Sequence, residues 1–120
     1  MSSEASITFE NTGEVTIARV HLSELTSQLA DAMLAQFAQM VQAGQPARLV
    51  VDLSSVKFID SIALGTLVVL LRRVKQDEGR LVLAGLGGHA LRVLQVTGLE
   101  KIFDLRRDVP SAVDSATSSS

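Results

Sequence analysis

A run of apolar residues near the middle of the chain constrains the fold most. Residues 49–53 read Leu-Val-Val-Asp-Leu, and residues 80–84 form a second run, Arg-Leu-Val-Leu-Ala. A strand with one face in water alternates apolar and polar side chains, whereas a nearly continuous apolar run is typical of a strand covered on both faces. Such strands occur in parallel sheets between layers of helices. We therefore expect an α/β fold.

Turn residues and apolar periodicity divide the rest of the chain. The expected strands are residues 6–10, 14–20, 48–53, 80–84 and 102–105, and the expected helices are residues 25–43, 61–76, 89–97 and one that begins at Asp108 to Pro110. Strand–helix–strand crossovers give parallel neighbours. This order predicts one domain over residues 1–114, with a central mixed sheet of four to five strands and about four helices. Residues 115–120 are expected to form a disordered tail.

Composition excludes several classes of function. The formal net charge is −2, the chain has four Phe but neither Trp nor Tyr, and Cys is absent. These values argue against nucleic-acid binding and exclude disulfide or thiol chemistry. The apolar run at residues 62–71 is too short to span a bilayer, and the N-terminal residues do not resemble a signal peptide. We expect a cytoplasmic protein that does not act on membranes.

The most informative polar pair follows the central strand. Asp60-Ser61 opens an apolar helix, which places a serine hydroxyl at the positive end of a helix dipole. A phosphate added there would introduce nearly two negative charges. The simpler alternative is that Ser61 or Asp60 only caps the helix.

Other candidate sites are weaker. Gly85-Leu86-Gly87-Gly88 matches neither a P-loop nor a dinucleotide fingerprint, so a tight strand-to-helix turn is the better interpretation. His21 and His89 are isolated, without the spacing of metal ligands. A hydrolase using Ser61 and one of these histidines lacks a recognisable base and orienting group. We expect no catalytic residue, no metal and no cofactor.

The central segment DLSSVKFIDSIALG resembles the signature of STAS domains, above all of bacterial anti-sigma factor antagonists. The residues that fit this signature are Asp52, Leu53, Ser54, Val56, Asp60, Ser61, Leu64 and Gly65. The later segments EGRLVLAGL and LRVLQVTGLEKIF also resemble the family, and the likeness extends over residues 15–113.

The resemblance implies a partner switch in which the unphosphorylated protein captures an anti-sigma factor and so releases a sigma factor. In many members the anti-sigma factor is a serine kinase that phosphorylates the antagonist, and a serine phosphatase reverses the reaction. On this pattern Ser61 is the phosphoacceptor. The partner-binding residues implied are Asp60, Ile62, Ala63, Leu64, His21, Leu22, Ser23 and Glu24.

Two departures from the family pattern keep an alternative open. Ile62-Ala63 replaces the usual Ser or Thr followed by Gly, and the segment Val20-His21-Leu22-Ser23-Glu24 replaces a Gly-x-x-Asp element. The alternative is a constitutive scaffold or self-associating regulatory protein in which Ser61 is only a helix cap. The switch predicts a monomer or weak dimer, and the scaffold predicts a stable larger oligomer.

Overall fold

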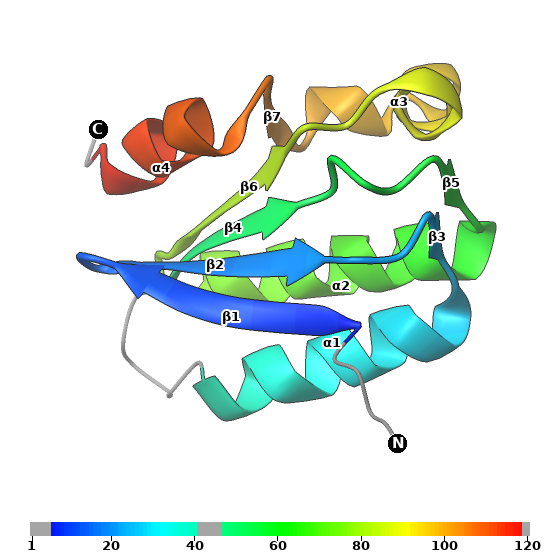
Figure 1. The fold of residues 1–120 in the computed structure, drawn as a ribbon. Helices are drawn as coiled ribbons and strands as arrows, with labels where there is room; N and C mark the ends of the chain where they lie inside the picture. The colour runs from blue at the N-terminus through cyan, green and yellow to red at the C-terminus, as the bar shows by residue number, and fades with distance from the viewer. Residues whose placement is uncertain (1–5, 41–46, 119–120) are drawn as a thin grey trace.

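A five-stranded mixed sheet forms the centre of the computed structural model, which describes residues 6–40 and 47–118 (Figure 1). Its strands lie in the order β1 (Ile7–Thr12), β2 (Val15–Val20), β4 (Arg48–Asp52), β6 (Arg80–Ala84) and β7 (Asp104–Arg106). β1 and β2 are antiparallel and the remaining neighbours are parallel. The predicted α/β class and mixed sheet are therefore confirmed.

Helices cover both faces of the sheet. They are α1 (Ser27–Met40), α2 (Ser61–Gln76), α3 (Gly88–Thr97) and α4 (Val109–Thr117), with a short 3-10 helix, η1, at Leu99–Lys101. Figure 1 shows α1 and α2 together below the sheet, and α4 on the opposite side. The described helices do not include one with the length and hydropathy of a membrane span.

The central strand shows why its apolar run is nearly continuous. Leu49 and Val51 pack into the core that the sheet shares with α1, α2 and α3. Val50, which points to the other face, packs against Ala112 and Ala116 of α4. Both faces of β4 are thus removed from water, as the sequence predicts.

Two short strands were not predicted. β3 (Glu24–Leu25) and β5 (Phe58–Ile59) form a parallel two-residue ladder apart from the main sheet. Leu25 therefore belongs to β3, and α1 begins two residues later than expected. The predicted C-terminal part of this helix, residues 41–43, lies outside the described residues.

The predicted disordered tail is wrong at its first residues. Ser115 to Thr117 form the last turn of α4, and Ser115 and Ala116 are buried. Asp108 starts this helix by accepting a hydrogen bond from the Ser111 amide at 2.9 Å. The Ser115 hydroxyl donates to Asp104, and Arg48 donates to the Ala116 carbonyl, so both side-chain and backbone groups hold this end of the helix on the sheet.

Candidate functional site

The loops that follow β2 and β4 meet at one edge of the sheet, where these parallel strands end. The carbonyl of Ser23 accepts hydrogen bonds from the Lys57 amide at 2.6 Å and the Phe58 amide at 3.1 Å. The ladder of β3 and β5 extends this contact. The predicted 21–24 loop and the Asp60-Ser61 pair are therefore brought to the same end of the molecule.

The Asp60 carboxylate joins the starts of two helices. Its Oδ1 accepts a hydrogen bond from the Ala63 amide of α2 at 2.7 Å, and its Oδ2 accepts from the Ser27 amide of α1 at 3.2 Å. The Asp60 backbone is extended, as an N-cap requires. A negative charge between two positive helix ends is electrostatically favourable. Asp60 is thus the structural residue of the pair.

Ser61 is the first residue of α2 and is exposed. Because Asp60 occupies the cap position, the interpretation of Ser61 as a helix cap is wrong. The Ser61 hydroxyl makes no hydrogen bond to another of the described residues. Its removal would leave the observed hydrogen bonds at the start of α2 intact.

Exposed apolar side chains accompany Ser61 at this end of the molecule. The exposed fraction is 63% for Ile62, 52% for Phe58 and 43% for Leu22. We refer to Leu22, Phe58, Ser61 and Ile62 as the rim. Phe58 was not among the predicted site residues, because its exposure depends on the β3–β5 ladder.

The remaining predicted partner-binding residues fall into two groups. Ala63 and Leu64 are buried, so the expectation that they contact a partner directly is wrong. Successive residues of a helix are rotated by about 100°, and this rotation directs both side chains into the core. His21, Ser23 and Glu24 are exposed beside the rim. His21 also holds the loop to β1, with Nε2 lying 2.8 Å from the Thr8 hydroxyl.

The first half of the signature supports the loop beneath the rim. Asp52 is buried at the end of β4, and its Oδ1 accepts from the amide and hydroxyl of Ser54 at 3.0 and 2.7 Å. Its Oδ2 accepts from Arg19 at 2.9 Å. A hydrogen bond to Glu10, with further contributions from the charges of Glu10 and Asp52, outweighs desolvation and raises the pKa of Arg19. The permanently charged Arg19 thus neutralises the buried carboxylate.

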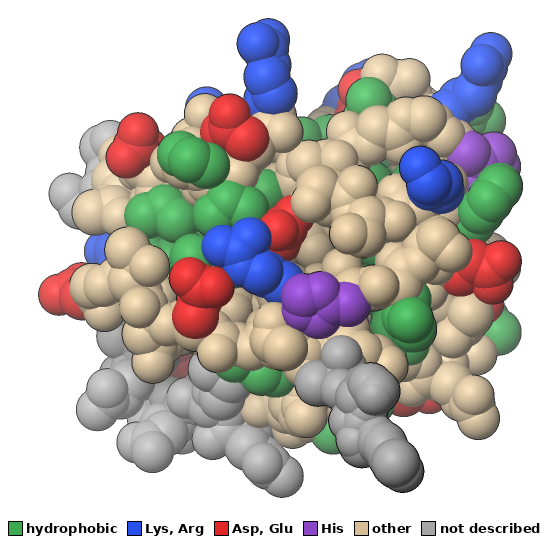
Figure 2. Space-filling model, viewed as in Figure 1, with side chains coloured by type: hydrophobic (Ala, Val, Ile, Leu, Met, Phe, Trp, Pro, Cys, Tyr) green, Lys and Arg blue, Asp and Glu red, His purple; other side chains and the backbone are tan. Residues whose placement is uncertain are grey.

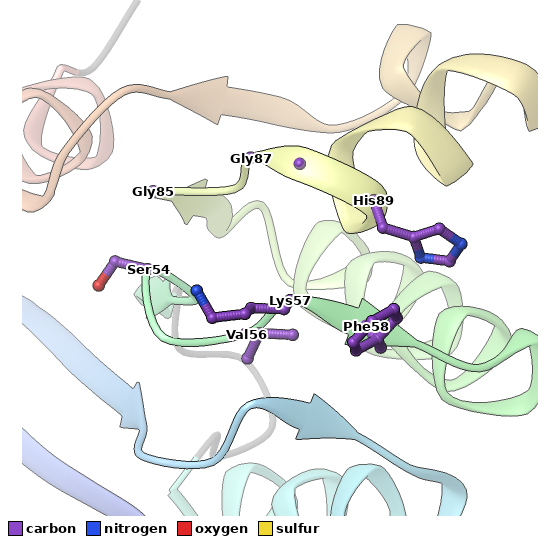
Figure 3. Close-up of a pocket in the computed structure, with 8 residues that line it drawn as sticks. Ser54, Val56, Lys57, Phe58, Gly85, Gly87 and His89 are labelled. Carbon is purple, nitrogen blue, oxygen red and sulfur yellow. The ribbon is translucent and has the colours of Figure 1, made fainter.

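A glycine lets the loop after β6 approach this support. Gly85 has a φ of +79°, and a Cβ built there would lie 2.7 Å from the Cβ of Ser54. The close approach helps to shape a hollow of about 390 Å³ beside the rim (Figure 3). Its lining residues are Ser54, Val56, Lys57, Phe58, Gly85, Gly87, Gly88 and His89.

Neither histidine hydrogen-bonds to Ser61 within the part of the chain that the structure describes. His21 contacts Thr8, and the His89 ring lies 5.2 Å from the Phe58 ring, measured between centroids. Within residues 6–40 and 47–118, no three His, Cys, Asp or Glu side chains gather as potential metal ligands.

Comparisons with known proteins match most of the chain to one family. The family model described as "STAS domain" matches residues 6–112. An "Anti-sigma-B factor antagonist" of Listeria monocytogenes is 34% identical over 56 residues, which cover 47% of this chain and 49% of the relative. The match thus spans about half the length of that curated relative.

Solved structures extend the likeness to nearly the whole chain. A STAS domain protein described as an anti-sigma-factor antagonist from Planctomyces limnophilus has a TM-score of 0.81 and 23% identity, over 96% of this chain and 100% of that one. The anti-sigma factor antagonist SpoIIAA in its unphosphorylated form has a TM-score of 0.68 and 17% identity, over 90% of this chain and 94% of that one. At these identities the two structures support the fold.

Proposed function

The chain belongs to the STAS domain family, and we propose that it is an anti-sigma factor antagonist that works by partner switching. The unphosphorylated protein binds an anti-sigma factor through the rim. The anti-sigma factor is a serine kinase that phosphorylates Ser61 and thereby dissociates the complex, and a serine phosphatase restores the binding form.

The proposal rests on the different roles of Asp60, which caps α2, and Ser61, whose side chain is exposed. Asp60 caps α2 and contacts α1, so the local structure does not depend on the Ser61 hydroxyl. That hydroxyl is exposed in the rim and free to be modified without loss of a described hydrogen bond. The likeness to an anti-sigma-B factor antagonist of Listeria monocytogenes, and to the anti-sigma factor antagonist SpoIIAA in its unphosphorylated form, supports the proposed class of function.

Charge explains how the switch would act. A phosphate on Ser61 adds close to two negative charges beside Ile62, which is 63% exposed. A partner that covers Ile62 must then remove those charges from water or place them against its own surface. Unfavourable charge placement at an interface costs several kcal/mol, and each 1.4 kcal/mol is about tenfold in affinity. We expect phosphorylation to weaken the complex by at least about a hundredfold.

The test uses tagged wild-type protein, Ser61→Ala and Ser61→Glu to capture partners from the source cells. Wild type and Ser61→Ala should retain an ATP-binding protein that Ser61→Glu loses. Incubation of that partner with ATP should add one phosphate to wild type and none to Ser61→Ala. Phosphate on another residue, or equal retention by all three proteins, would overturn the switch.

A constitutive scaffold is the second candidate, and Ile62 favours it. An exposed isoleucine in the first turn of α2 suits permanent association, since it leaves apolar surface in water when unpaired. The scaffold predicts a stable large oligomer in light scattering that Ser61→Glu does not change. The switch predicts a monomer or weak dimer.

A further inference from the structure

The hollow beside the rim has features of a second contact site for the same partner. Phe58 connects the two surfaces, because it is half-exposed in the rim and also lines the hollow. Figure 3 shows Phe58 and His89 beside one another at one end of the hollow, with the Lys57 side chain extending along the loop toward Ser54. A partner that covers Phe58 can therefore contact the rim and the hollow through one continuous interface.

The charged side chains that line the hollow and its neighbour on α3 are cationic, and the acidic Glu24 lies outside these linings, opposite Phe58 in the β3–β5 ladder. Lys57 lines the hollow beside the rim, and Arg92 lines the adjoining hollow on α3 together with His89. Neither cation forms an ion pair or hydrogen bond with the described residues, and the linings of both hollows contain no Asp or Glu. In Figure 2, Lys or Arg side chains and a histidine lie with apolar groups at the end of the molecule that carries β5 and α3, and an acidic side chain lies beside them. The linings of the two hollows thus carry only positive charge, in a chain whose net charge is −2.

Apolar area continues along α3 beyond the charges. Val96 is 80% exposed, and with Val93, Thr97, His89 and Arg92 it lines a shallow hollow of about 230 Å³. A complementary segment would therefore combine apolar side chains with at least one carboxylate. Such a segment would bury Phe58 and Val96 and place a carboxylate near Lys57.

We propose that the anti-sigma factor carries an acidic, apolar segment that docks along β5 and α3, with an Asp or Glu side chain in the hollow at Lys57. This inference rests on the proposed function, since it names the chemistry of that partner. The rim would respond to Ser61 phosphorylation, and the hollow would supply orientation and electrostatic attraction. Charge pairs of this kind act mainly on the association rate and its dependence on salt.

The test measures binding kinetics of the partner captured by wild-type protein. Lys57→Glu should slow association about tenfold and reduce its salt dependence, and Lys57→Arg should retain both. Arg72→Glu is the matched control, because it makes the same charge change at an exposed position on α2 outside these hollows. Thermal unfolding of each variant checks that the fold is intact.

The outcomes separate this inference from the switch. If Lys57→Glu and Arg72→Glu associate at the same rate while Ser61→Glu has lost binding, the acidic docking segment is overturned and the switch stands. If Ser61→Glu binds as wild type does, the switch fails. Capture of no ATP-binding partner by wild type overturns both.

Discussion

Substitution of Asp60 should destabilise the fold, whereas substitution of its neighbour Ser61 should not. Asp60→Ala removes the acceptor for the Ala63 amide at 2.7 Å and for the Ser27 amide at 3.2 Å. Loss of a side-chain N-cap costs about 1 kcal/mol, and loss of a further hydrogen bond costs about 1 kcal/mol. The expected decrease in the free energy of unfolding is therefore about 2 kcal/mol.

The same estimate gives a measurable shift in melting temperature. Unfolding entropy is about 2.1 cal/mol/K per residue, so for 120 residues it is about 0.25 kcal/mol/K. A loss of about 2 kcal/mol then lowers Tm by about 8 °C. Ser61→Ala should change the free energy of unfolding by less than about 0.5 kcal/mol, as is usual for an exposed side chain without a structural contact.

Guanidinium unfolding followed by circular dichroism measures these differences, and an unchanged slope with denaturant shows that the compared states are equivalent. Asp60→Asn is the matched control. Its single side-chain oxygen still caps one helix, but its amide group cannot accept the second hydrogen bond. We expect the free energy of unfolding of Asp60→Asn to lie between those of wild type and Asp60→Ala. A loss for Ser61→Ala as large as that for Asp60→Ala would refute the assignment of structural and switching roles.

Two further predictions concern the support of the site and of the sheet. Gly85→Ala should lower the free energy of unfolding by about 2–4 kcal/mol, because the new Cβ would sit on a left-handed backbone and contact Ser54. Gly87→Ala should lower it much less, because a Cβ there meets nothing within 4 Å. Equal losses in denaturant unfolding would contradict this explanation. Burial opposes ionisation of Asp104, but hydrogen bonds from Ser115 and Arg106 and the nearby arginine charges outweigh it and lower the pKa of Asp104 below its ordinary 3.8. A lowered carboxyl pKa stabilises the fold above the unfolded-state value and loses that contribution as pH falls through the folded-state value. The free energy of unfolding of Asp104→Asn should therefore fall less steeply below about pH 4 than that of wild type. An equally steep fall in the two proteins would count against this network.

The architecture was predictable where the pattern of side chains in a short segment depends on how that segment packs in the fold. The apolar run of β4 implied two covering layers, and the structure places Leu49 and Val50 against opposite ones. The ladder of β3 and β5 was not predictable, because two residues are too short for a periodic signal and the paired strands lie far apart in sequence. Phe58 could therefore not be recognised as part of the rim.

The errors at the site and at the C-terminus have separate physical causes. Ala63 and Leu64 adjoin Ser61 in sequence, but the rotation of the helix directs them into the core. The C-terminal residues suggested disorder because they are small and polar. In the structure small side chains let α4 pack closely on the sheet, and Ser115 bonds to Asp104. The sequence indicated a capping residue at Asp60-Ser61, but not the second contact from Asp60 to α1.

The affinity of the anti-sigma factor for the unphosphorylated and Ser61-phosphorylated forms tests the proposed switch most directly. Calorimetric titration of both forms, with Ser61→Ala exposed to the same kinase reaction as a control, separates the phosphate from other effects of the treatment. The switch predicts that phosphorylation at Ser61 weakens binding by at least about a hundredfold, while Ser61→Ala binds as the unphosphorylated protein does. Equal affinity of the two wild-type forms would contradict it.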